Sequence, residues 1–249
     1  MGRYISDETK KSRNWGNINS EEAVYHSFKT IPETYSYGLS TLVWDWKVDR
    51  SVHTFSIAET KVFYSLRWND AIVEIKEHVP MDLEETKMIA ESLGYKIPFS
   101  GEKMMTTDFV VTDDRGFKTA INVKASRKKT SRKSMHYATI EETYWKNHGV
   151  KWIQVFGEDL DDLEMMNLAS IVQYYDEKNV FDDISMIKHL IAIKELKMPL
   201  DEFVDYGALA EFYRNCDRVE TFIKKMNDKQ WAKNRNLLMN FEYNREIFK

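Results

Sequence analysis

The chain has 249 residues, of which 43% are hydrophobic and 31% are charged, and its formal net charge is −4 at pH 7. This composition predicts a folded globular protein with a proper core. No segment is long and apolar enough to span a membrane, and a single cysteine excludes an internal disulfide framework, so we expect a cytoplasmic protein. The small negative charge gives no overall footprint for nucleic acid, and such a contact must be local or supplied by a partner.

The first part of the chain is expected to lead into the core and to cover it. Residues 20–30 are interpreted as a short helix and residues 35–48 as an aromatic, strand-like segment. Residues 54–68 have the apolar spacing of a helix, and Glu59 lies on the apolar stripe. Two explanations of this acid are open. Ser56 and Glu59 match an S-x-x-E capping box, or Glu59 points inward because it meets a cation.

The central part of the chain predicts a mixed α/β unit. The expected elements are a strand at 71–79, a helix at 82–94, strands at 106–112 and 117–125, a helix at 135–148 and a strand at 150–156. A strand, a helix and a further strand over this length indicate a right-handed parallel crossover back onto the sheet. With the helix at 54–68 placed first, the order of the core is αβββαβ.

The hairpin at residues 106–125 carries the polar residues that we regard as functional. The alternation of side chains along a strand places Asp108 on one face and Phe109 on the other. On the following strand, Asn122 and Lys124 share a face. One face of the sheet therefore carries Asp108, Asn122 and Lys124.

An acid on one strand, followed by an acid or amide two residues before a lysine on the next strand, suits a Mg²⁺-dependent phosphodiesterase. Hard divalent cations bind carboxylate, amide and main-chain oxygens, and the lysine then lies near the metal-bound water or the scissile phosphate. The alternative is a solvated hairpin face on which the acid and the lysine pair across the strands. The spacing alone does not decide between them.

The αβββαβ order, with Glu on the first helix, Asp on the second strand and an x-K pair on the third, is the layout of the restriction-endonuclease-like nuclease core. More closely, the sequence resembles the TnsA family, the endonuclease subunit of heteromeric cut-and-paste transposases. The resemblance covers residues 20–176, and it is carried by SIAETKVFYSL, MTTDFVV, AINVKAS and IEETYWKNHGVKWIQVF.

This resemblance implies that Glu59, Asp108 and Lys124 form the catalytic set. It also implies one or two Mg²⁺ ions, for which Mn²⁺ can substitute, held by Glu59, Asp108, Asn122 and the main-chain carbonyl of Val123. The chain departs from the family at Asn122, where the family tends to carry Gln. An amide offers an oxygen but no charge, and Asn is one methylene shorter than Gln.

A basic cluster follows the Lys124 strand directly. Its functional interpretation is contact with DNA phosphates, which gives a salt-dependent affinity without sequence preference. The alternative is a solvated loop and helix start. On the next helix, the acids of the E-E-T-Y-W run are expected at the surface and its aromatic residues in the core. The cluster consists of Arg127, Lys128, Lys129, Arg132 and Lys133.

The sequence predicts two domains, a catalytic domain at residues 1–175 and a small helical domain at residues 176–249. Helices are expected at 182–197, 200–214 and 218–226, separated by Pro199 and a polar break. In the resembling family the C-terminal domain is winged-helix-like and contacts DNA and the ATPase regulator. A helical cap on the nuclease core is the alternative.

The function that the resemblance implies is cleavage of the 5′ strand at each transposon end. The expected partners are DNA, a DDE-type transposase of the TnsB type and an AAA+ ATPase regulator of the TnsC type, with no membrane partner. Two alternatives stay open: a stand-alone restriction or repair nuclease of the same core, and a non-catalytic scaffold that kept the fold and lost the metal.

Overall fold

The computed structural model describes residues 6–13, 15–17, 25–33 and 39–233. Its internal contacts divide the chain into two compact units, residues 1–160 and residues 161–249, and each unit is described by itself. The domain boundary predicted after residue 175 falls inside the second of these units. In the described residues, no helix has both the length and the apolar character needed to cross a membrane.

The first unit begins with short elements that lie before the main sheet. Part of the sequence prediction is wrong here, because residues 25–30 carry no helix; residues 18–24 lie outside the described residues. Where a strand was predicted at 35–48, the structure has the shorter strand β1, which pairs antiparallel with β2. Residues 34–38 lie outside the described residues. The elements are α1 (Asp7–Ser12), the 3-10 turn η1 (Ile31–Glu33), β1 (Thr41–Asp45) and β2 (Arg50–Thr54).

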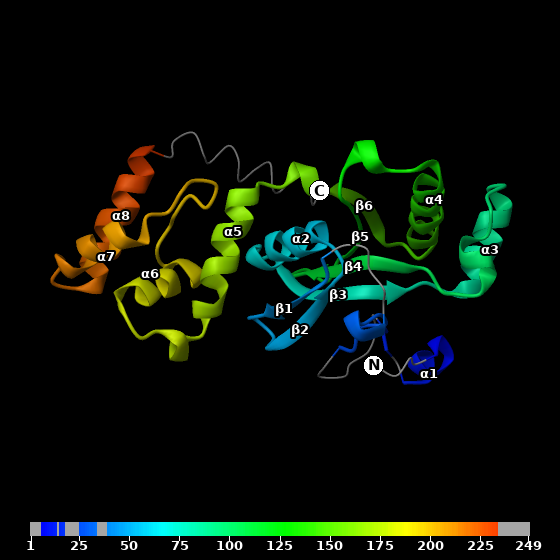
Figure 1. The fold of residues 1–249 in the computed structure, drawn as a ribbon, viewed down its shortest axis with the longest axis horizontal. Helices are drawn as coiled ribbons and strands as arrows, with labels where there is room; N and C mark the ends of the chain where they lie inside the picture. Colours follow the sequence, from blue (N-terminus) through cyan, green and yellow to red (C-terminus); the bar gives the residue numbers. More distant parts are fainter. Residues whose placement is uncertain (1–5, 14, 18–24, 34–38, 234–249) are drawn as a thin grey trace. The chain divides into compact units, whose positions relative to one another are not determined.

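A four-stranded mixed sheet forms the centre of the first unit (Figure 1). The strand order is β3-β4-β5-β6, with antiparallel pairing between the first three strands and parallel pairing of β5 with β6. Helix α4 provides the crossover between the two parallel strands, as predicted, and α2 precedes the sheet, so the αβββαβ core is confirmed. The elements are α2 (Ile57–Trp68), β3 (Ile72–Pro80), β4 (Thr106–Asp113), β5 (Lys118–Lys124), α4 (Arg132–Asn147) and β6 (Lys151–Phe156).

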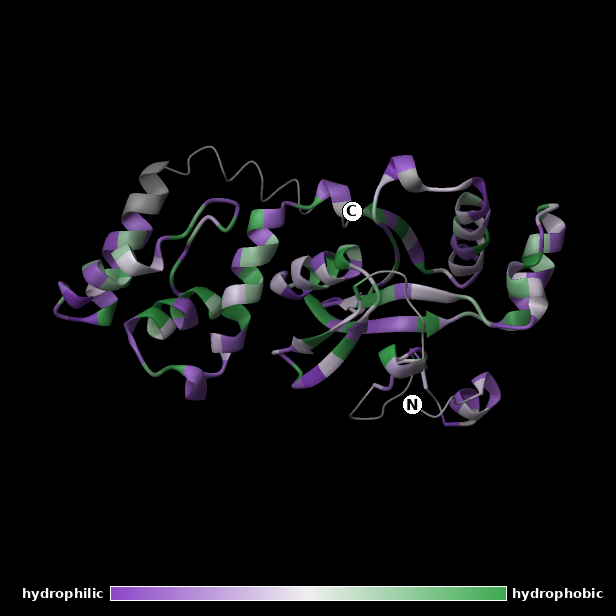
Figure 2. Ribbon diagram, in the orientation of Figure 1, coloured by the Kyte–Doolittle hydropathy of each residue, from purple (hydrophilic) through white to green (hydrophobic). Residues whose placement is uncertain are grey.

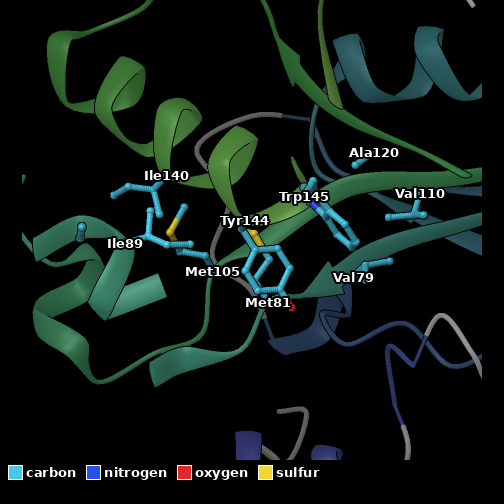
Figure 3. Packing of buried hydrophobic residues seen from close by; sticks show 10 residues of the cluster. Val79, Met81, Ile89, Met105, Val110, Ala120, Ile140, Tyr144 and Trp145 are labelled. Carbon is cyan, nitrogen blue, oxygen red and sulfur yellow. The ribbon is translucent and has the colours of Figure 1, made fainter. Parts of the chain in front are cut away.

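One face of the sheet packs against α4, and α3 (Leu83–Ser92) packs against α4. Val110 and Ala120 of the sheet belong to one buried cluster with Ile140 and Trp145 of α4. In Figure 3, Trp145 lies on the side of Val110 and Ala120, and Ile140 lies beside Ile89 of α3. Each helix begins at a residue whose side chain accepts backbone N–H groups, Asp82 for α3 and Ser131 for α4. Burial of these side chains is the main force that closes the crossover.

The opposite face of the sheet carries Phe109 and Ile121, which are fully buried. Helix α2 contacts β3 and β5, and its residues Val62 and Phe63 are buried too. The helix thus presents its apolar stripe to the sheet, as the spacing predicted. Short 3-10 turns connect the elements, at η2 (Pro98–Gly101), η3 (Arg127–Lys129) and η4 (Gly157–Asp159).

The second unit is helical in the part that the structure describes. The three helices predicted there are confirmed, two of them shorter than predicted (α6 and α7) and one longer (α8), and α5 was not predicted. Between residues 161 and 233 no strand is described, so the β wing of a winged helix is not seen in that range. The elements are α5 (Asp162–Ile171), η5 (Val172–Tyr175), η6 (Glu177–Asn179), α6 (Asp183–Ala192), α7 (Tyr206–Arg214) and α8 (Val219–Lys233).

Candidate active site

The candidate site lies where β4 and β5 separate. Their ladder ends with Phe109 opposite Ile121, although both strands continue beyond this pair. In the next position, a carboxylate oxygen of Asp108 accepts a hydrogen bond from the backbone N–H of Val123, at 2.6 Å. The aspartate side chain therefore takes the place of a backbone acceptor and holds the two strands apart. The opening leaves the main chain at residues 122–124 beside an acid.

Glu59 reaches the same region from the first turn of α2. Its carboxylate accepts from the backbone N–H of Phe55 at 2.8 Å and from the Ser56 hydroxyl at 3.0 Å, and its own N–H donates to Ser56 Oγ at 3.1 Å. The residue is 9% exposed. The capping interpretation is thus correct in kind, with the N–H of Phe55 rather than that of Ser56 as the backbone donor. Being a cap does not remove Glu59 from the site.

The charges of Glu59 and Asp108 act on each other. Burial and the charge of Asp108 raise the pKa of Glu59 to about 7, against the hydrogen bonds from Phe55 and Ser56 and the charge of Lys124. Burial also raises the pKa of Asp108, against the charge of Lys124, the hydrogen bond from Val123 and the charge of Lys29. Two buried acids, one of which has its pKa raised by the charge of the other, favour the uptake of a cation or a proton.

Lys124 ends β5 beside these two carboxylates. Its Nζ donates to the carbonyl oxygen of Val123 at 3.2 Å, and its side chain is half-buried. The structure therefore brings together the three residues predicted as the catalytic set, together with the predicted main-chain ligand. Their assignment as catalytic residues stays a prediction at this point.

Asn122 has a different environment from the one that a metal ligand needs. Its amide nitrogen donates to Glu141 Oε2 at 2.7 Å, and its amide oxygen accepts from Gln154 Nε2 at 3.0 Å. Both ends of this buried amide are thus engaged by α4 and β6. Asn122 stays a predicted ligand, but the hydrogen bonds point to a role in fixing β5 relative to its neighbours.

Glu141 is a site residue that the sequence prediction missed, because it was expected at the surface with Glu142. Glu142 is exposed, but Glu141 is only 2% exposed. Burial and the charge of Asp108 raise the pKa of Glu141 to about 7. Its Oε1 atom has no hydrogen-bond partner in the described structure. A signal existed, since Glu141 lies three residues after Ala138 and four before Trp145, on the buried stripe of α4.

His78 of β3 borders the site as an uncharged side chain. Its ring stacks on Phe55, with centroids 4.3 Å apart, and Nε2 donates to the carbonyl of His53 at 2.8 Å. Burial lowers the pKa of His78 to about 3, so the ring is neutral near pH 7. Nε2 lies 3.9 Å from Glu59 Oε2, which is too far for a hydrogen bond. The residue has a φ of 51°, a strained value for a side chain other than glycine.

The members of the basic cluster differ in whether acidic residues compensate their charge. Arg127 donates to both carboxylate oxygens of Asp159 at 2.6 Å and to Glu158 at 3.3 Å, and it stacks on Phe156. Its charge is thus already compensated by two acids. Lys128 is exposed in the turn after β5, which Figure 2 colours purple, and Arg132 and Lys133 are exposed in the first turn of α4. The side chain of Lys129 lies outside the described part.

The donor set at the opening fits a hard divalent cation. Glu59, Asp108 and the Val123 carbonyl offer oxygens only, and the raised pKa values of both acids show that uncompensated negative charge is costly there. Within the described residues, no group of three or more His, Cys, Asp or Glu side chains is arranged to hold a metal ion. A cation at this site would therefore depend on main-chain and substrate oxygens as well.

A mixed four-stranded sheet, a helical crossover and two acids with a lysine at the strand opening define the class of restriction-endonuclease-like cores. Comparison with known proteins refines this class. Residues 69–156 match the family model "TnsA-like endonuclease N terminal". The chain is also 25% identical over 177 residues to the Transposon Tn7 transposition protein TnsA of Escherichia coli. Both comparisons show that part of this chain is similar to TnsA proteins.

The extent of the two matches differs at the site. The alignment with the E. coli protein covers 68% of this chain and 65% of that protein. The family model begins at residue 69, so it includes Asp108, Asn122, Val123 and Lys124 but not Glu59. The role of Glu59 as a site residue is supported instead by its location beside Asp108.

Proposed function

We propose that this chain is a metal-dependent DNA endonuclease subunit of a cut-and-paste transposition machinery, and that it cleaves the 5′ strand at the transposon ends. The observation that carries the proposal is the meeting of Glu59, Asp108 and Lys124 at the opening between β4 and β5. The similarity to TnsA proteins supports the transposition context. A transposase of the TnsB type and an ATPase of the TnsC type are the proposed partners.

The residues at the opening have separate tasks in this proposal. Asp108, the Val123 carbonyl and Glu59 would hold Mg²⁺, or Mn²⁺ in its place. The bound ion supplies polarisation of the phosphate and a lowered pKa for a coordinated water. Lys124 orients the attacking water or neutralises charge that develops on the phosphate. The bond from the Val123 N–H fixes one Asp108 oxygen, and the other oxygen would bind the ion.

Strand cleavage in the reconstituted system tests this function. The chain is mixed with the transposase, the ATPase, Mg²⁺ and DNA that carries both transposon ends, and primer extension maps the cut strand. Lys124→Ala should abolish 5′-strand cleavage, whereas Lys118→Ala, at the start of the same strand, should retain it. Retained cleavage in Lys124→Ala would count against the assigned role.

Two other functions give different outcomes. Plasmid cleavage by the chain alone with Mg²⁺ would favour a stand-alone restriction or repair nuclease. The non-catalytic scaffold has one observation in its favour, since Asn122 is engaged by Glu141 and Gln154 and contributes no charge. Calorimetric titration that detects no Mn²⁺ binding, even with DNA present, would support the scaffold.

A further inference from the structure

Lys29 is a basic residue near the opening that belongs neither to the sheet nor to α2. It lies in the segment of residues 25–30, and its Nζ donates to the hydroxyl of Thr106 at 2.7 Å. Thr106 begins β4, two residues before Asp108. The next residue, Thr107, accepts from the indole N–H of Trp145 at 2.5 Å. Two side-chain hydrogen bonds thus fix the strand just before the aspartate.

Hydrogen bonds from the N-terminal residues and within the segment hold the backbone that carries Lys29, and Tyr25 Oη donates to the carbonyl of Glu77 in β3 at 2.6 Å. Lys10 Nζ donates to the carbonyl of Phe28 at 2.8 Å, and Ser27 Oγ donates to the carbonyl of Lys29 at 2.7 Å. Gly16 donates to the carbonyl of His26 at 2.8 Å. A Cβ atom at Gly16 would lie 2.4 Å from a ring carbon of Pro80, so only glycine permits this approach. The position of Lys29 is therefore set by the fold.

The charges around Lys29 come from three elements. Asp108 of β4, Glu59 of α2 and Asp7 of α1 attract its ammonium, and Lys10 of α1 repels it. Burial lowers the pKa of Lys29, and the three carboxylates oppose this shift. In the other direction, the charge of Lys29 lowers the pKa of Asp108. The carboxylate pair therefore experiences two lysines, Lys124 at the end of β5 and Lys29 from the N-terminal segment.

We propose that Lys29 is a further residue of the nuclease site, whose ammonium compensates Glu59 and Asp108 in the free protein and the DNA phosphate during cleavage. This inference rests on the proposed function. One ammonium hydrogen is used by Thr106, which leaves two donors for oxygens at the opening. A fixed positive charge near a phosphate lowers the cost of the charge that develops there.

The test compares Lys29→Met with the unsubstituted chain in two measurements. Loss of a positive charge should tighten Mn²⁺ binding about tenfold by calorimetry, because the carboxylates then attract the ion without competition. Loss of the same charge should slow DNA cleavage by about tenfold or more in the reconstituted system. Opposite changes are the signature of a charge role, since a displaced Asp108 would weaken both. Lys29→Arg should restore both values to within about threefold.

Lys10→Met is the matched control, because it loosens the same segment without removing the ammonium bonded to Thr106. It should not tighten Mn²⁺ binding. If Lys29→Met leaves the Mn²⁺ affinity unchanged while Asp108→Asn abolishes Mn²⁺ binding, the proposed role of Lys29 is overturned and the proposed function is not. If the unsubstituted chain binds no Mn²⁺ through Asp108, the proposed function fails. In that case, urea unfolding without metal tests the charge interaction between Lys29 and Asp108. Lys29→Met should lower the urea midpoint less in the Asp108→Asn background than in the unsubstituted chain. Equal decreases in the two backgrounds would overturn the proposal.

Discussion

Asp45 and Glu77 are buried beside arginines, whereas Glu59 and Asp108 are buried beside each other. Arg67 donates to Asp45 at 2.5 Å, and Arg50 donates to both Glu77 oxygens at 3.0 and 2.8 Å. Among the described residues, Glu59 and Asp108 receive only backbone and hydroxyl hydrogen bonds directly, and the two lysines act on the pair through charge. We infer that the arginine pairs serve the fold and that the carboxylate pair keeps its oxygens for a cation. Four predictions test this contrast.

The largest effect is expected for Asp108→Asn. Cleavage should fall by about a thousandfold or more, because the amide carries no charge to hold a cation. Stability should change little, since an amide oxygen can still accept from the Val123 N–H and the buried charge of Asp108 itself is removed. Cleavage assays and urea unfolding measure the two quantities. Retention of more than about a tenth of the activity would contradict the assignment.

Asp45→Asn should have the reverse profile. It leaves the Arg67 charge buried without its partner, and Arg67 Nε already has no acceptor in the described structure. Removal of one member of a buried ion pair costs about 3 kcal/mol or more of unfolding free energy. The urea midpoint should therefore decrease clearly, while the folded fraction still cleaves DNA. Equal midpoints for Asp45→Asn and Asp108→Asn would remove the distinction between the two pairs.

The metal-free chain should lose stability as the pH rises through the acidic range. Glu59 has a folded pKa of about 7, above its ordinary value of 4.5, so the folded state keeps a proton that the unfolded state has released. The unfolding free energy should thus fall between these two pH values, by up to about 3 kcal/mol from this group. Glu59→Gln should reduce the slope of stability against pH, and Mg²⁺ should reduce it in the unsubstituted chain.

Glu141 has a similarly raised pKa and will contribute to the same slope. The difference between Glu59→Gln and the unsubstituted chain isolates Glu59 from this background. Chemical denaturation at several pH values between about 4.5 and 7.5 provides the measurement. Identical slopes in the two proteins would mean that Glu59 is not the group that titrates.

The smallest effect separates two members of the basic cluster. Arg127→Ala should reduce DNA affinity by less than about twofold, because Asp159 and Glu158 already compensate its charge. Arg132→Ala should reduce affinity by about threefold at low salt, with a smaller effect at high salt, as expected for a phosphate contact. Fluorescence anisotropy with duplex DNA measures both. A larger loss for Arg127→Ala would show that DNA displaces the acidic partners.

Much of the fold could be predicted from the sequence because its determinants are local. Alternating strands, helical stripes and capping residues placed β3 to β6, α2 and α4 within a few residues of their bounds. Asp108 and Lys124 could be assigned to one region for the same reason. The helix predicted at 20–30 failed at residues 25–30, where hydrogen bonds to distant parts, such as Lys29 with Thr106, decide the conformation.

The sequence by itself therefore determined the order of the core and the residue types of the candidate site. Only the tertiary structure decided which oxygens stay available, because hydrogen-bond partners and burial come from elements far apart in the chain. Asn122 is engaged by Glu141 and Gln154, Arg127 is compensated by Asp159, and Lys29 reaches the start of β4 from the N-terminal segment. The interaction energy between two charges depends on their separation and solvation, and the local spacing of residues in the sequence sets neither quantity.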